Sequence, residues 1–199
     1  QATDKISLGL LYDQPFGADS QYPLESNIFS TINSKTGKLE GTSVEVKTNS
    51  ITALIGYQPN ENWNLYAGPV YQTVKANVSL RGLAYKGPKV LGGYDIDIKE
   101  DEAYGWLAGF AYSIPEIALK AAVTYRSEIK HELDTKETFD FGTDGSLYIP
   151  GFTSQPGLTT VTPTYHKAEI TTPQSVNIDL QSGIAKDTLA FANIRWVHW

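Results

Sequence analysis

The chain has 199 residues, enough for one ordinary domain, and a formal net charge of −6, which argues against a nucleic-acid partner. Cysteine is absent, so disulfides and thiolate metal sites are excluded. Methionine is also absent, including at position 1, so the chain is expected to begin at a processing or excision point. The longest apolar run, residues 103–112, is far shorter than the roughly 20 residues of a membrane helix but matches the 9–11 or so of a membrane strand.

Seven strands are expected in chain order, because large or apolar residues recur at every second position. They are residues 4–13, 42–57, 62–81, 93–113, 117–130, 167–184 and 188–199. In the first strand Ile6, Leu8 and Leu10 alternate with mostly smaller or polar residues. In the second strand the alternation changes phase near residues 48–50, which predicts a β-bulge there.

The hairpin at residues 103–130 has two different faces. Large residues such as Trp106 and Phe110 alternate with small ones such as Gly105 and Gly109. In a soluble sandwich the apolar face of such a hairpin is core and the other face meets solvent. In a transmembrane barrel the apolar face meets lipid and the other face lines the lumen. The hairpin alone leaves both interpretations open.

The connections between the expected strands alternate strictly between short and long. The short ones are residues 58–61, 114–116 and 185–187, and the long ones are residues 14–41, 82–92 and 131–166. All short turns then lie at one end of the sheet, as in an outer-membrane barrel with short periplasmic turns and long outer loops. Tyr57, Trp63 and Tyr112 cluster at the short-turn end, where an aromatic girdle would lie. The pattern therefore favours an all-β, antiparallel, up-and-down transmembrane β-barrel.

The same segments resemble the long-chain fatty acid transporter family of Gram-negative outer membranes, the FadL type. The matching segments are residues 54–74, 104–112, 117–130 and 172–199, with TYRSE at residues 124–128 the most specific. The resemblance implies a fourteen-stranded barrel closed from inside by an N-terminal hatch. It also implies capture of long-chain fatty acids or similar hydrophobic compounds by outer loops, transfer to an interior pocket, and escape sideways into the membrane at a kinked strand.

The chain departs from the family pattern in its number of strands. Residues 1–199 are expected to form one barrel segment of seven strands, about half of the barrel, without the hatch and the remaining strands. The segment is expected not to close by itself, whereas the parent protein is expected to be a monomer in the bacterial outer membrane. The expected partners of the parent protein are the lipid bilayer and a long-chain fatty acid or other hydrophobic small molecule.

Candidate ligand-binding cations come from the face assigned to the lumen. Lys120, Arg126 and Arg195 share this face, and a cation there can hold a fatty-acid carboxylate by a charge-assisted hydrogen bond. The preferred alternative is that Arg126 pairs with a wall acid such as Glu128 and only stabilises the wall. Arg81, near the outer end of the third expected strand, sits where the resemblance implies a basic residue of the family's pocket.

The third long connection, residues 131–166, is rich in apolar side chains. They form either a capture site for the hydrophobic substrate or a loop that packs on itself. The candidate residues of this connection are Phe139, Phe141, Leu147, Tyr148, Ile149 and Phe152.

No set of residues predicts catalysis, a metal or a cofactor. His131, His166 and His198 are scattered and are expected at the surface, and Asp95 and Asp97 are interpreted as a charged strand face rather than a calcium site. The expected function is transport without a reaction. The rivals are a general polar porin and a soluble β-sheet binding or adhesion domain.

Overall fold

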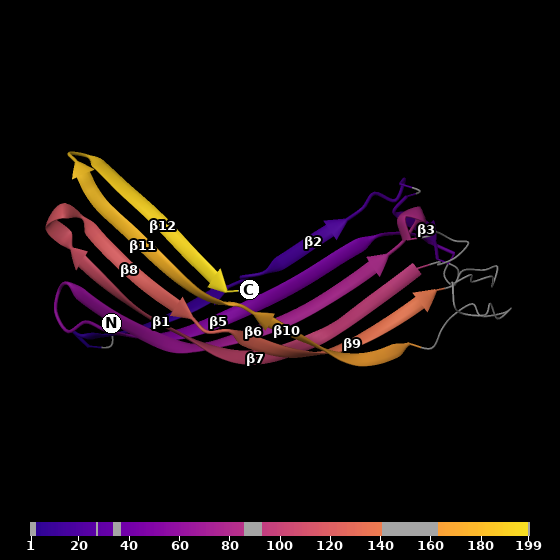
Figure 1. Ribbon diagram of the computed structural model, residues 1–199, viewed down its shortest axis with the longest axis horizontal. Helices are drawn as coiled ribbons and strands as arrows, with labels where there is room; N and C mark the ends of the chain where they lie inside the picture. Colours follow the sequence, from indigo (N-terminus) through magenta and orange to yellow (C-terminus); the bar gives the residue numbers. More distant parts are fainter. Residues whose placement is uncertain (1–2, 27, 34–36, 86–92, 141–162, 199) are drawn as a thin grey trace.

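The computed structural model describes residues 3–26, 28–33, 37–85, 93–140 and 163–198, and these are almost entirely β-strand (Figure 1). Ten strands form one curved antiparallel sheet, and β3 and β4 form a separate hairpin, so the predicted all-β antiparallel fold is confirmed. The strands are β1 (Ile6–Asp13), β2 (Gly17–Gln21), β3 (Ser30–Ile32), β4 (Leu39–Gly41), β5 (Ser43–Tyr57), β6 (Trp63–Leu80), β7 (Gly93–Ile114), β8 (Leu119–Arg126), β9 (Ile129–Asp140), β10 (Thr164–Thr172), β11 (Gln174–Ala185) and β12 (Thr188–His198). The helical segments in these ranges are the 3-10 turns Leu83–Tyr85 and Pro115–Ile117. Neither of them is long and apolar enough to cross a membrane.

The sheet has two parts that share its central strands. Next to the short turns the strand order is β1-β5-β6-β7-β8-β11-β12. Toward the long connections β2 pairs with β5, and β9 lies between β7 and β10. In Figure 1 the short turns lie at the left and the long connections at the right. In the described residues β1 pairs only with β5 and β12 only with β11, so the sheet is open.

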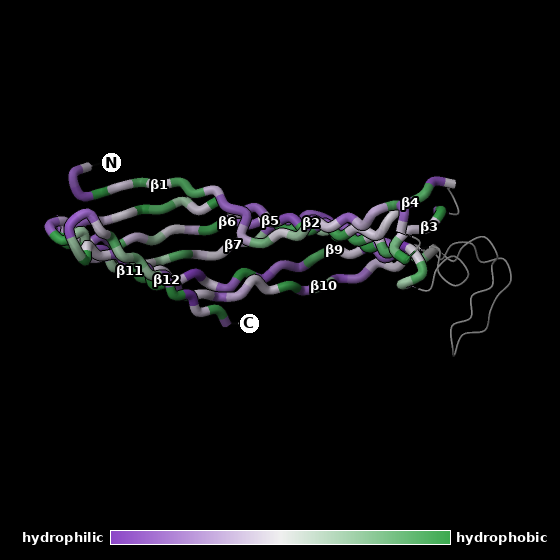
Figure 2. The backbone as a smooth tube through the Cα atoms, turned by 90° about the horizontal axis from the view of Figure 1, so that it is seen from above, coloured by the Kyte–Doolittle hydropathy of each residue, from purple (hydrophilic) through white to green (hydrophobic). Residues whose placement is uncertain are grey.

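The pairing register separates the two faces of the wall beside the short turns. Paired residues lie on the same face, so they can be followed as a row from β1 to β12. One such row is Ile6, Tyr57, Leu65, Phe110, Val123, Ile178 and Ile194, and the adjacent row on the opposite face is Ser7, Gly56, Tyr66, Gly109, Thr124, Asn177 and Arg195. The first row is wholly apolar or aromatic and the second is small or polar. Figure 2 shows the matching alternation of colour along the strands.

The apolar face is exposed, as predicted for a face that meets lipid. Tyr104 is 71% exposed, Trp106 52% and Phe110 43%. Leu119, Val123 and Tyr125 lie on the same face through their pairing with β7. No second sheet covers this face in the described part of the chain. A soluble sandwich would bury this face, so its exposure favours the membrane interpretation of the hairpin.

Tyr66 crosses the inner face of β7 at a glycine. Its hydroxyl forms a 2.6 Å hydrogen bond with Thr124 Oγ1 on β8, so its ring lies over Gly109 between them. A Cβ on Gly109 would be 2.6 Å from the ring and would also meet the Val123 carbonyl oxygen. Glycine is therefore required there by close approach.

Replacing Gly109 with alanine is expected to displace the Tyr66 ring and to lower the free energy of unfolding by roughly 1–3 kcal/mol, the usual cost of overpacking. Urea unfolding of the protein in detergent measures the loss. Gly9→Ala is the matched control, because the added Cβ would lie 3.7 Å from Leu54 Cβ, an ordinary contact. Equal stability of the two variants would contradict this role for Gly109.

Three expected loop or strand boundaries are wrong. The predicted strand 117–130 ends at Arg126, and β9 continues to Asp140 inside the predicted loop 131–166. The predicted strand 167–184 is two strands, because Pro173 has no N–H to donate and separates β10 from β11. The predicted loop 14–41 contains β2, β3 and β4.

Candidate functional site

A β-bulge exchanges the two faces of β7. Val74 pairs with Asp101, but Ala76 pairs with Ile98, so β7 has one extra residue at this level. Toward the short turns the odd positions of β7 face inward, and toward the long connections the even positions do. Figure 1 shows β7 running the length of the sheet through this point.

Beyond the bulge the inner face is apolar on β5, β6 and β7. Its residues on these strands are Val44, Val46, Ala76, Val78, Leu80, Tyr94, Ile96 and Ile98. β9 adds Thr135 and Glu137 to this face through their pairing with Ile98 and Ile96. The outer face there carries Lys47, Lys75, Asn77 and Asp97. The predicted bulge near residues 48–50 is wrong, because the pairs between β5 and β6 run without a shift from Ser43–Ser79 to Thr52–Val70. The apolar residues of β5 change from odd to even positions because the apolar side of the wall changes from the outer face to the inner face at this level.

Two neighbouring strands are interrupted at the same level of the wall. Ser127 and Glu128 separate β8 from β9, and Pro173 separates β10 from β11. β8 pairs with β7 only at residues 107–114 of β7. β9 pairs with β7 only at residues 93–98 of β7. Residues 99–105 of β7 therefore have no partner strand on this side within the described ranges. We call this interval the seam.

The first residues of β9 lie over the inner face of β6 and β7. Ile129 packs in a buried cluster with Val70 and Leu107. A Cβ on Gly105 would lie 2.6 Å from Ile129 Cγ1, so only glycine lets β9 approach this closely. His131 follows on the same face and is completely buried, which makes its expected surface position wrong.

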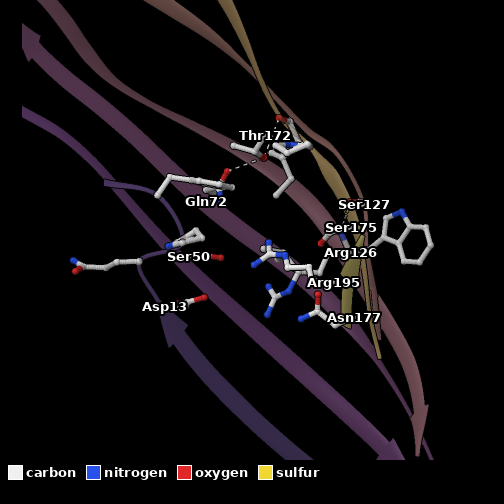
Figure 3. Close-up of a pocket in the computed structure, with 16 residues that line it drawn as sticks. Asp13, Ser50, Gln72, Arg126, Ser127, Thr172, Ser175, Asn177 and Arg195 are labelled. Carbon is white, nitrogen blue, oxygen red and sulfur yellow. Dashed lines mark hydrogen bonds between the residues drawn. The ribbon is translucent and has the colours of Figure 1, made fainter. Parts of the chain in front are cut away.

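A cavity of about 350 Å³ lies on the inner face beside the seam (Figure 3). Its polar lining includes Asp13, Ser50, Gln72, Ser127, Ser175 and Asn177. Trp106, whose side chain lies on the outer face, also borders it. The Trp106 amide donates to Ser127 Oγ at 3.0 Å, and the Ser127 amide donates to the Trp106 carbonyl at 3.0 Å. The cavity thus reaches from the lumen side to the seam.

Arg126 from β8 and Arg195 from β12 both line this cavity and lie side by side in Figure 3. Neither forms an ion pair with an acid among the residues that the structure describes, and Asp13 lies on the other side of the cavity. The expected pairing of Arg126 with Glu128 is therefore wrong. Glu128 is exposed, in the short break between β8 and β9.

Asn177 Oδ1 is buried beside Arg126 and Arg195, with no hydrogen-bond donor in the described part of the chain. Two cations and a free acceptor can bind a hydrated anionic head group.

The other predicted cations lie elsewhere. Lys120 is exposed near the short turns, in a separate hollow with Asp179 and Asn193, away from Arg126. Arg81 is at the opposite end of the wall, where its Nη2 lies 2.9 Å from both Glu40 Oε2 and Asp95 Oδ1. The guanidinium of Arg81 is thus held by wall acids.

Only one of the predicted apolar capture residues can be placed. Phe139 stacks on Tyr94 with ring centroids 4.6 Å apart, on the inner face of β7 and β9. The others, Phe141, Leu147, Tyr148, Ile149 and Phe152, lie outside the described residues.

These features define the class of the protein. A tilted antiparallel wall with an exposed apolar band outside, aromatic residues at the ends of the band and polar groups inside is that of a transmembrane β-barrel.

Comparison with known sequences gives the family. A profile described as outer membrane protein transport protein (OMPP1/FadL/TodX) matches residues 2–199, and the chain belongs to this family. The predicted family and the predicted outer-membrane location are thereby confirmed. No curated protein sequence matches the chain.

A solved structure supports the same fold. The chain is similar to the Pseudomonas putida toluene transporter TodX, with a TM-score of 0.61 and 11% sequence identity. The similarity covers 99% of this chain and 52% of TodX, so the chain spans about half the length of that transporter.

Proposed function

We propose that this wall takes part in the uptake of long-chain fatty acids, or of hydrophobic acids of similar shape, across the Gram-negative outer membrane. The observation that carries the proposal is a pair of arginines, Arg126 and Arg195, that have no acidic partner among the described residues and lie in one cavity beneath an apolar inner face. A fatty acid has the complementary shape, because it joins one carboxylate to a long apolar tail.

The two parts of the ligand match two parts of the wall. The carboxylate would accept hydrogen bonds from the arginines, each stabilising the complex by roughly 1.5–3 kcal/mol. The tail would lie along the apolar inner face beyond the bulge, where burial contributes about 25 cal/mol for each Å². An uncharged ring such as toluene would use the second interaction only. The proposal therefore favours an amphiphilic acid over an aromatic hydrocarbon.

The seam offers an exit into the bilayer. In the part of the chain that the structure describes, residues 99–105 of β7 lack a partner strand on that side, and the cavity borders Trp106 on the lipid-facing surface. A ligand in the cavity would reach lipid there without crossing the polar short-turn end. We propose that release occurs sideways through the seam.

A general polar porin is the rival function. Its lumen should be polar along its whole length, whereas the inner face of β5, β6 and β7 is apolar beyond the bulge. Conductance that falls when small sugars fill the channel would support the porin.

Binding of three probes to the protein in detergent tests the proposal. Palmitate is expected to bind more tightly than its methyl ester by about tenfold or more, since the ester cannot form the charge-assisted bonds. Toluene is expected to bind more weakly than both, because it buries less apolar surface. Equal binding of acid and ester would contradict a carboxylate site, and a preference for toluene would replace the proposed substrate class.

A further inference from the structure

The cavity beside the seam holds more polar groups than a single carboxylate can engage. Ser50 and Ser175 are each 2% exposed and line the cavity, yet neither hydroxyl forms a hydrogen bond within the described residues. The Asp13 carboxylate also lines the cavity, and in the same part of the chain it has no hydrogen-bonding or ionic partner. Buried hydroxyls are normally hydrogen-bonded, and an unpaired one costs free energy. These groups therefore indicate a ligand with a second polar group.

The polar groups of the cavity form two sets on opposite sides (Figure 3). The first set is the pair of arginines together with Ser175 and Asn177, on β8, β11 and β12. The second set is Asp13, Ser50 and Gln72, which pair with one another across β1, β5 and β6 and so share the inner face. We call this second set the β5 row.

The two sets lie at different levels of the wall. Arg126 pairs with Leu107 of β7, whereas Gln72 pairs with Ala103, four residues closer to the long connections. At a rise of about 3.3 Å per residue the levels are roughly 13 Å apart, about the length of ten carbons in an extended acyl chain. Val70, at the level between them, lines the cavity with apolar surface. A fatty acid held by the arginines would therefore pass the β5 row at the middle of its chain, on its way to the apolar face beyond the bulge.

The chemistry of the β5 row selects a hydroxyl group. A carboxylate only accepts hydrogen bonds, so Asp13 favours a group that donates, and its charge repels a second carboxylate on the ligand. The Ser50 hydroxyl can donate to the same ligand oxygen. A plain acyl chain would cover both groups with hydrocarbon and satisfy neither, which costs free energy.

We propose that the β5 row is a second subsite, which binds a hydroxyl group in the middle of the acyl chain. The preferred ligands are then long-chain acids hydroxylated at about the tenth to twelfth carbon, by the spacing of the two levels. The hydroxyl donates to Asp13 and accepts from Ser50. The inference rests on the proposed uptake of long-chain acids and names the class of acid within it.

Binding of matched ligands to the protein in detergent tests the inference. 12-Hydroxystearate is expected to bind about tenfold more tightly than stearate, because it gains a hydrogen bond to a charged group. 18-Hydroxystearate is the positional control, since its hydroxyl would lie on the apolar face beyond the β5 row, and it should bind no more tightly than stearate.

Variants of β5 assign the preference to this subsite. Ser50→Ala is expected to reduce the tenfold preference for 12-hydroxystearate to less than about threefold. Thr52→Ala is the matched control and should keep the preference, because Thr52 is the next inward-facing residue of β5 and is 3% exposed, but lies outside the cavity. Should Ser50→Ala fail to fold, Asp13→Ala, at an exposed position, is expected to show the same loss.

Equal binding of 12-hydroxystearate and stearate to the unmodified protein overturns the inference, and so does a preference that survives in Ser50→Ala. The methyl esters of both compounds separate this result from the proposed function. If the acids bind more tightly than the esters but the hydroxyl adds nothing, only the hydroxyl subsite is rejected. If the hydroxyl preference persists in the esters while acid and ester bind equally, the carboxylate site is rejected and the hydroxyl subsite stands. Failure of all four compounds to bind rejects both.

Discussion

Replacing Arg81 with methionine is expected to detach the β3–β4 hairpin from the rest of the wall. The Arg81 side chain is 6% exposed, and it donates to Glu40 on β4 and to Asp95 on β7. Without it two carboxylates face each other with no counter-charge. Removal of one partner from a buried ion pair costs roughly 3–5 kcal/mol, and we expect about 3 kcal/mol here, because the acids are 32% and 33% exposed.

The effect should be local, because Arg81 is at the junction of the hairpin with β6. Thr42 Oγ1 donates to the Arg81 carbonyl at 2.9 Å and accepts from its amide at 2.8 Å. Hydrogen exchange of residues 30–32 and 39–41 is therefore expected to accelerate by about a hundredfold, while β11 and β12 stay protected.

Lys47→Met is the control for the loss of a cation. Lys47 also forms an ion pair, with Glu45, but its side chain is 51% exposed. Exposed pairs of this kind contribute little to stability, because water screens the two charges, so exchange should change little. Equal acceleration in both variants, or none in the Arg81 variant, would contradict the role of Arg81 as the attachment point of the hairpin.

Replacing both Arg126 and Arg195 with glutamine is expected to remove selective binding of fatty acids. The loss of two charge-assisted hydrogen bonds should weaken palmitate binding by a hundredfold or more, at roughly 1.5–3 kcal/mol for each bond. Binding of the methyl ester should change by less than about threefold. Isothermal titration of both ligands on the same preparation gives the comparison.

The stability of the wall separates this role from a structural one. Arg126 and Arg195 have no acidic partner in the described residues, so their loss breaks no ion pair there and relieves the repulsion of two like charges. The thermal midpoint of the double variant is expected to stay the same or rise. Lys120→Gln, on the same face in a different hollow, should leave palmitate binding unchanged. A lower midpoint with unchanged palmitate binding would return Arg126 to the structural role first expected for it.

The sequence was sufficient to predict the fold class and the two faces near the short turns. There the outer positions are large and the inner positions are small or polar, so period two is visible in single strands such as residues 103–112. β9 was not predicted beyond residue 130, because polar residues interrupt its buried face. Apolar Ile129 and Leu133 alternate there with His131 and Thr135, so no continuous apolar stripe marks the strand.

The cavity could be predicted only in part, because its contacts join distant strands. Arg126 and Arg195 were assigned correctly to the inner face from alternation alone. Their position in one cavity depends on β11 lying between β8 and β12, and the pairing of Arg81 depends on a hairpin some 40 residues earlier. His131 has no sequence feature that distinguishes it from a surface histidine. Its burial results from the inward course of β9, which in turn needs Gly105.

The exchange of faces at the bulge also fixes how deep the wall sits in the membrane. Below the bulge the outer face ends in Tyr71 and Tyr104, whose rings are 5.4 Å apart, and just above it come Lys75 and Asp97. If the barrel sank by two residues, about 7 Å along a strand, these charges would approach the hydrocarbon. Lysine there costs up to about 2–4 kcal/mol near the midplane and less toward the surface. If it rose, the exposed apolar band would enter water. The bulge therefore fixes the depth of the wall in the bilayer and holds the seam at the boundary of the apolar band.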